Sequence, residues 1–323
     1  MKPVTQTKTI YYKVAQFQKK SSHLQSHLEK ALELRKKPIS RVEYIDPEAK
    51  YKRFINSFRL QGGMIFGQLL SYEEGKDSTI LVLDEASDEF PIEALSLPPS
   101  KDGKTQEFLE SVLYFGVLEN HVLILQSKSL KSRDLENHLM WFFRDCTSTL
   151  DKRNAILLSD LPTKEARKRV EKMPVKKVVI GSSLETKYSE QDEGKKTSKM
   201  VFGPVGRGFD ILTAALGADW RKGLKLDDSL DEANLRVNLE VSYYRKTTDA
   251  AHKILDNIAT AMRHAEPDDV KVHLQDGPVL KGADLKFAGH VRVKTYNGII
   301  DSSDLYNEML AWLTNQIQLG TIT

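Results

Sequence analysis

The chain has 323 residues, of which 40% are hydrophobic and 29% charged, and its formal net charge is +3. This composition supports a packed core and excludes wholesale disorder. No apolar run approaches the roughly 20 residues that span a bilayer, and the N-terminus lacks the apolar stretch of a secretory signal. We therefore expect a cytoplasmic protein without a membrane partner.

The single cysteine, Cys146, limits the chemistry that the chain can perform. One cysteine cannot form an internal disulfide, and alone it cannot supply a thiolate metal site. His23 and His27 are spaced for shared metal ligation on one helix, but they have no neighbouring cysteine, so a solvated helix face is the favoured interpretation. We expect no metal and no cofactor.

Both helix and strand patterns occur in the first half of the chain. Ser22 and Gln25 have the spacing of a capping box that opens a helix ending before Pro38. Apolar runs on either side of Glu119-Asn120 predict a β-hairpin. The predicted strands are 8–16, 58–71, 78–83, the hairpin 112–126, 155–159 and 176–182, the helices are 22–37, 132–145 and 163–173, and an acidic loop covers 84–106.

The second half begins after a polar segment without periodicity. Residues 183–200 are predicted to form a flexible linker or loop between an N-terminal α+β domain, 1–182, and a C-terminal α+β domain, 201–323. Within the second domain we expect helices at 209–216, 248–264 and 304–319, a strand at 235–244 and a hairpin at 270–294. Strands and helices mix without regular alternation, so the predicted fold class is α+β, with mixed, mostly antiparallel sheets and packed helices.

Charge is segregated along the chain. Residues 1–60 carry about +9, residues 61–120 about −9 and residues 121–180 about +6. Two interpretations remain open: the basic and acidic segments offset each other inside the fold, or the basic segments form a surface for phosphates.

Basic residues next to aromatic ones, and a basic helix at 163–173, suit binding to single-stranded nucleic acid by stacking and phosphate pairing. The glycine-rich turn around Gly206, Arg207 and Gly208 precedes a predicted helix and is a candidate anion site. The candidate nucleic-acid-binding residues are Lys13, Lys36, Lys37, Lys52, Arg53, Lys164, Arg167, Lys168 and Arg169.

Residues 133–138, RDLENH, resemble the R-φ-x-x-x-H pattern of HEPN ribonucleases. The resemblance implies that Arg133 and His138 would promote attack by an RNA 2′-hydroxyl without a metal. Glu185 and Lys187, with Asp160 upstream, are similar to the acidic–lysine pattern of magnesium-dependent restriction-type nucleases. Both resemblances cover a few residues only.

These observations favour a nucleic-acid-binding protein that acts by binding rather than by chemistry, with RNA or DNA as its partner. A prokaryotic defence or regulatory complex would be a natural setting for it. The alternatives are a nuclease, and a protein-interaction scaffold or homo-oligomer that uses the acidic segment 72–93.

Overall fold

The computed structural model describes residues 2–45, 50–83, 92–97, 105–163, 165–166, 168–169, 173, 175–183, 185–191, 199–205, 236–242, 270–274 and 279–322. The chain divides into two units, each described here by itself. Unit 1 comprises Met1–Leu161 and Phe287–Thr323, and unit 2 comprises Pro162–Lys286.

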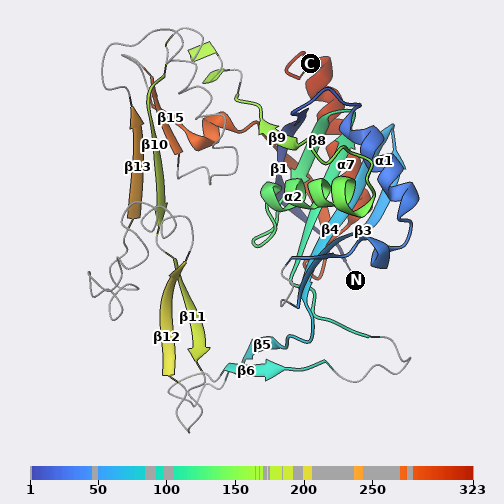
Figure 1. The fold of residues 1–323 in the computed structure, drawn as a ribbon, viewed down its shortest axis with the longest axis vertical. Coiled ribbons are helices and arrows are strands. Elements are labelled where there is room, and N and C mark those ends of the chain that lie inside the picture. Colours follow the sequence, from blue (N-terminus) through green and yellow to red (C-terminus); the bar gives the residue numbers. More distant parts are fainter. Residues whose placement is uncertain are drawn as a thin grey trace. The chain divides into compact units, whose positions relative to one another are not determined.

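A nine-stranded antiparallel sheet is the framework of unit 1 (Figure 1). The strand order is β17, β16, β1, β8, β7, β4, β3 and β2, and β9 also pairs with β1. The strands are β1 Val4–Phe17, β2 Glu43–Tyr44, β3 Tyr51–Gln61, β4 Met64–Glu73, β7 Ser111–Leu118, β8 His121–Leu125, β9 Ile156–Asp160, β16 Ala288–Tyr296 and β17 Ile299–Ile300. A separate two-stranded sheet pairs β5 Ser78–Leu81 with β6 Ile92–Leu95.

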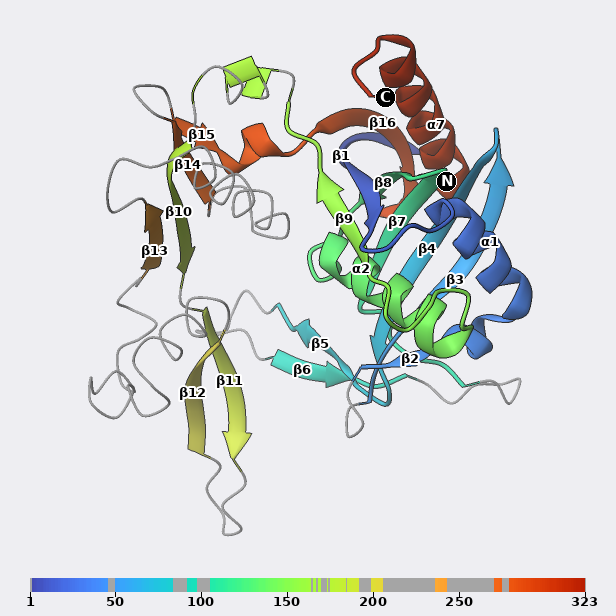
Figure 2. The same ribbon diagram turned by 45° about the horizontal axis from the view of Figure 1, so that its top comes forward.

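Helices cover both faces of the large sheet (Figures 1 and 2). Helix α1, Leu24–Leu34, and helix α2, Ser132–Trp141, pack on one face; a short 3₁₀ helix, η1 Pro38–Arg41, follows α1, and α2 continues into a π-helix, η2 Phe142–Cys146. Helix α7, Ser302–Gln318, packs on the opposite face. The mixture of antiparallel strands and packed helices confirms the predicted α+β class.

Alternation along the central strands supplies the two apolar cores. In β7, Phe115 is buried toward α1 and α2, whereas its neighbour Tyr114 is buried toward α7. Close packing around Phe115 requires a glycine at 67 on the adjacent strand β4, because a Cβ atom there would overlap the Phe115 ring. The β3–β4 turn, Gly62-Gly63, has positive φ at both residues, as a two-residue hairpin of this type demands.

Unit 2 is inserted between two strands of the large sheet, β9 and β16. Both strands pair with β1, at its two ends. Where the chain leaves and re-enters unit 1, the Phe287 amide donates to the Leu161 carbonyl at 2.8 Å, and Tyr12 N–H donates to the Phe287 carbonyl at 2.9 Å. The units have other bounds than the predicted domains 1–182 and 201–323, because β16 pairs with β1 in the sheet of unit 1 and α7 packs on that sheet.

Within unit 2, a four-stranded antiparallel sheet has the order β13, β10, β14, β15, and β11 pairs with β12. The described part of the predicted linker 183–200 is extended strand rather than loop, since most of it lies in the β11–β12 pair. The bounds are β10 Val175–Ser183, β11 Glu185–Gln191, β12 Lys199–Val205, β13 Arg236–Ser242, β14 Val270–Leu274, β15 Val279–Lys281 and the 3₁₀ helix η6 Gly282–Leu285.

Helix α1 begins differently from the prediction. The side chain of Ser22 does not cap it; instead the backbone N–H of Leu24 donates to Asn120 Oδ1 at 2.8 Å, from the β7–β8 turn. The Gln25 side chain accepts from Glu119 N–H at 2.7 Å, which ties the same turn to the helix. The predicted hairpin at 112–126 and final helix are confirmed, and Gly320 adopts the positive φ of a helix-ending glycine.

The predicted helices at 209–216 and 248–264 lie outside the described residues, as does most of the acidic loop 84–106. Among the described residues, none of the helices is both long and apolar enough to cross a membrane.

Candidate nucleic-acid interface

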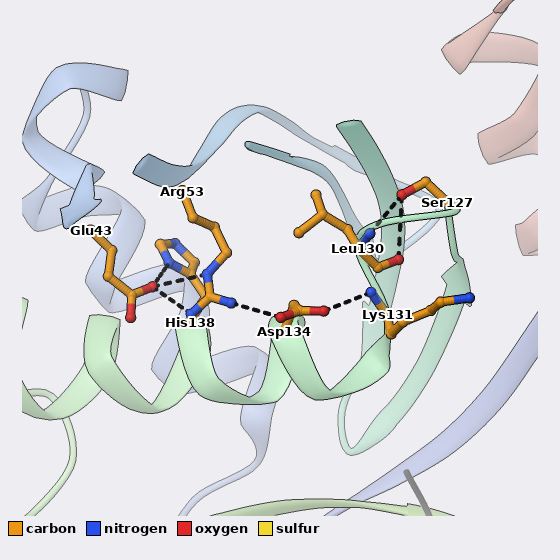
Figure 3. Close-up of polar contacts among 7 residues, drawn as sticks. All are labelled: Glu43, Arg53, Ser127, Leu130, Lys131, Asp134 and His138. Carbon is orange, nitrogen blue, oxygen red and sulfur yellow. Dashed lines mark hydrogen bonds and ion pairs between the residues drawn. The ribbon is translucent and has the colours of Figure 1, made fainter. Parts of the chain in front are cut away.

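Arg53 lies in a polar network beneath α2 rather than on an open surface (Figure 3). Its Nη2 and Nε atoms donate to Glu43 Oε2 at 3.0 and 3.1 Å, and Nη1 donates to Asp134 Oδ1 at 3.2 Å. The other Asp134 oxygen accepts from the backbone N–H of Lys131 at 2.8 Å, at the start of α2. Arg53 is 4% exposed. Its guanidinium is thus buried and already paired with two carboxylates of the same chain.

His138 belongs to the same network. Its Nδ1 donates to Glu43 Oε2 at 2.7 Å, and the imidazole is fully buried, with its ring plane parallel to that of Phe142. Burial lowers the pKa of His138 although Glu43 favours its charged form, so the ring is neutral. Burial alone would raise the pKa of Glu43, but its contacts with His138 and Arg53 hold it below the usual value.

Arg133 and His138 are not brought together, because they lie on different sides of α2. Arg133 is exposed, whereas His138 points into the core. Two groups that act on one phosphate must both reach it. The arrangement does not supply the paired Arg–His chemistry that the HEPN-like spacing suggested.

Two further candidates, Lys13 and Lys52, also contact carboxylates. Lys13 is 1% exposed, and its Nζ lies 2.6 Å from Asp160 Oδ1 across the β1–β9 pair. Lys52 Nζ lies 2.7 Å from Glu74 Oε2 and over the rings of Tyr44 and Tyr72. Like Arg53, both side chains have partners within the fold. Among these ion pairs, only Lys52–Glu74 joins the basic segment 1–60 to the acidic segment 61–120, because Glu43, Asp134 and Asp160 lie within the basic segments themselves.

The remaining candidates divide into two groups. Lys36 and Lys37 in unit 1, and Lys168 and Arg169 in unit 2, are exposed. The residues outside the described part of the chain are Lys164, Arg167, Gly206, Arg207 and Gly208.

A different set of cations gathers where two loops of unit 1 meet, after β1 and before β9. The buried Asn154 side chain joins the loops: its Oδ1 accepts from Lys19 N–H at 2.8 Å, and its Nδ2 donates to the Lys19 carbonyl at 3.2 Å. A backbone bond from Gln18 N–H to the Ala155 carbonyl, 2.9 Å, continues the junction. We call Lys19, Lys20, Arg144, Lys152 and Arg153 the basic cluster.

Three cations of the basic cluster, Lys19, Arg144 and Arg153, act on one carboxylate, that of Asp151. The Arg153 backbone N–H donates to Asp151 Oδ1 at 2.7 Å, and this bond is the main reason that the pKa of Asp151 lies below its usual value; Arg153, Lys19 and Arg144 add to the effect. The side chains of Arg153 and Asp151 are 85% and 61% exposed and only 3.9 Å apart at Nε and Oδ1, so their ion pair is loose.

Exposure distinguishes the basic cluster from the paired cations described above. Lys19, Lys20, Lys152 and Arg153 are exposed, and Arg144 is half-buried in η2. Two carboxylates, Asp151 and the exposed Asp145, stand beside these five cations, which leaves an excess of positive charge at the loop junction. Exposed ammonium and guanidinium groups around a positive excess can bind phosphates.

The sequence signals for the basic cluster were two short basic pairs, Lys19-Lys20 and Lys152-Arg153, each beside a predicted strand. Nothing in the sequence indicated that the pairs meet, because the β1–β9 pairing and the buried Asn154 side chain bring the loops together.

Among the described residues, no group of three or more His, Cys, Asp or Glu side chains is arranged to hold a metal ion. No protein-family model matches the sequence, and a search of curated proteins finds no significant match.

Proposed function

We propose that the chain binds nucleic acid through the basic cluster, by contacts to the phosphate backbone. The observation that carries the proposal is the loop junction at which Asn154 joins the segments Lys19-Lys20 and Lys152-Arg153, with Lys19, Arg144 and Arg153 near Asp151. A nucleic acid presents closely spaced phosphates, so several cations held on one framework can each neutralise one.

The proposed action is binding rather than chemistry. Ammonium and guanidinium groups are protonated at neutral pH; they position phosphates and do not accept protons. Asp151, the carboxylate at the centre, has a lowered pKa because the Arg153 backbone bonds to it, which makes it a weak base.

A filter-binding titration with labelled DNA and RNA oligonucleotides at two salt concentrations tests the proposal. For double-stranded DNA the logarithm of affinity falls with the logarithm of salt concentration, with a slope near −0.9 for each phosphate contacted. A Lys19→Ala, Lys152→Ala and Arg153→Ala triple variant is expected to weaken binding at least about tenfold and to make the slope shallower by about 2 to 3.

The matched control removes three exposed cations elsewhere in unit 1: Lys50→Ala, Lys128→Ala and Arg133→Ala. It loses the same charge and should keep most of the affinity. Absence of binding at low salt, or an equal loss in the control variant, would contradict the proposal.

A further inference from the structure

A groove runs between α1 and the outer part of the β3–β4 hairpin. Its volume is about 520 Å³, and its charged lining consists of Glu29 and Glu33 of α1 and Lys36, which follows the helix. The apolar lining comes from Leu32 of α1, Phe58 and Leu60 of β3, and Ile65 of β4. Figure 2 shows α1 beside this hairpin. Phe58 and Leu60 are 44% and 66% exposed, although both lie on the face of the sheet that carries an apolar core.

The same two residues lie on an open strand edge. β2 pairs with β3 only at Lys52 and Arg53, and within the described residues no strand pairs with the outer side of Phe58–Gln61. The residues that flank a two-residue hairpin form a hydrogen-bonded pair, here Gln61 and Met64, and such pairs alternate along the ladder. The backbone N–H and C=O groups of Phe58 and Leu60 therefore point outward.

Arg41 marks where this open edge begins. Its Nη2 donates to the Asn56 carbonyl at 2.8 Å, and its guanidinium lies over the Phe58 ring at 5.3 Å. Between Arg41 and the hairpin tip, the backbone of an incoming strand could exchange hydrogen bonds with the backbone of Phe58 and Leu60. The side chains of that strand would then enter the groove. This is the geometry by which extended peptides add to a sheet edge.

The charges along α1 define what the incoming strand must carry. The N-terminal end of α1 lies at the hairpin tip, since Gln25 Nε2 donates to the Gly63 carbonyl at 2.9 Å. Glu29 therefore lies nearer the tip than Glu33, which is in the last turn of α1, and Lys36 follows between the helix and Arg41. No described cation forms an ion pair with either glutamate. A basic side chain of the partner would pair with them.

We propose that this groove binds an extended segment of another protein, which pairs with the β3 edge at Phe58–Gln61, places alternate apolar side chains over Phe58 and Leu60, and sets a lysine or arginine beside Glu29 and Glu33. The proposal rests on the strand edge and the groove, so it is independent of the basic cluster and of nucleic-acid binding.

The test uses the full chain and a fluorescent, end-blocked peptide of alternating valines with one lysine. Three matched peptides accompany it: one carries glutamate in place of the lysine, and the other two carry N-methyl groups on one or the other alternate set of backbone nitrogens. Fluorescence anisotropy should show binding of the lysine peptide, binding at least about tenfold weaker for the glutamate peptide, and no binding of whichever N-methylated pattern blocks the edge-facing amides.

The protein variants reverse the charge of the groove. Glu29→Lys with Glu33→Lys should exchange the preference, so that the glutamate peptide binds better than the lysine peptide; this gain also shows that the variant is folded. Glu110→Lys, an exposed carboxylate outside the groove lining, is the charge control and should keep the original preference.

Four results would overturn the proposal: no binding of the lysine peptide, equal binding of both N-methylated patterns, an unchanged preference after the charge reversal, or the same reversal in the Glu110→Lys control. A dimer in sedimentation that Leu60→Lys dissociates would assign the edge to a second copy of the chain, and would overturn it as well.

Discussion

His138 donates from Nδ1 to Glu43 Oε2 at 2.7 Å, and this bond holds β2 to α2 with the imidazole fully buried. The same carboxylate oxygen accepts from Arg53 of β3, so one oxygen joins three elements (Figure 3). Buried polar groups that satisfy one another fix how elements pack. We infer that His138 has a structural role.

Replacing His138 with alanine should lower the free energy of unfolding by about 3 kcal/mol, because it opens a cavity and removes one donor from a largely buried carboxylate. Urea denaturation followed by circular dichroism measures the change. The control, Arg133→Ala on the exposed side of α2, should stay within about 0.5 kcal/mol. If RNA cleavage were detected and either variant abolished it, the structural assignment would be wrong.

Stability should fall as the pH drops below about 6.5, the usual pKa of histidine. Burial lowers the pKa values of His27, His121 and His138 in the folded protein. Below pH 6.5 the unfolded chain therefore binds protons that the folded chain does not. The free energy of unfolding has its full value above pH 6.5 and decreases as the pH falls below it. For the fully buried His138 the loss approaches about 1.4 kcal/mol per pH unit.

Urea denaturation at several pH values between 7.5 and 5 checks this dependence. His138→Asn keeps a donor for Glu43 but has no titrating ring. The slope of its unfolding free energy against pH should therefore be smaller than that of the wild type by the equivalent of about one proton. A wild-type stability that is constant across this range would contradict the neutral state of the buried histidines.

Local sequence patterns predicted most elements of unit 1. The hairpin that turns at Glu119-Asn120 could be predicted because its strands and turn are adjacent in the chain. The cap of α1 could not, since Asn120 reaches Leu24 only after the hairpin has packed beside the helix. The division into units is not visible in local patterns for a similar reason: β16 pairs with β1, although the two strands lie nearly 300 residues apart in the sequence.

The candidate site could not be predicted from the sequence, because a sequence shows how many charged residues the chain has but not which of them form ion pairs in the fold. Lys13 lies in one predicted strand and Asp160 directly follows another, 155–159, and only the β1–β9 register places them opposite each other. Lys19 and Lys152 carry no strong sequence signal because neither lies in a dense basic run, yet the β1–β9 pairing and the Asn154 amide bring their loops together.

Lys13 and Lys52 should differ sharply when each is replaced with alanine. Lys13→Ala leaves the nearly buried Asp160 without its ammonium partner and should cost about 3–5 kcal/mol. Lys52→Ala should cost about 1 kcal/mol, since its partner Glu74 is 54% exposed and remains solvated. Chemical denaturation gives both values. We expect both folded variants to keep most of their affinity for polynucleotides. A tenfold loss of affinity in either variant would show that the replaced lysine takes part in binding.

Asn120 should prove to be the N-terminal cap of α1, although it lies far from that helix in the sequence. Asn120→Ala removes the acceptor for Leu24 N–H, now bonded at 2.8 Å, and should destabilise the protein by about 1 kcal/mol, the usual value of a lost cap. Asn120→Asp keeps a side-chain oxygen and adds a negative charge near the helix N-terminus, so it should restore most of that loss. Hydrogen exchange of the Leu24–Leu28 amides locates the effect: protection should fall in the alanine variant and recover in the aspartate variant. Equal protection in both variants would show that another group caps the helix.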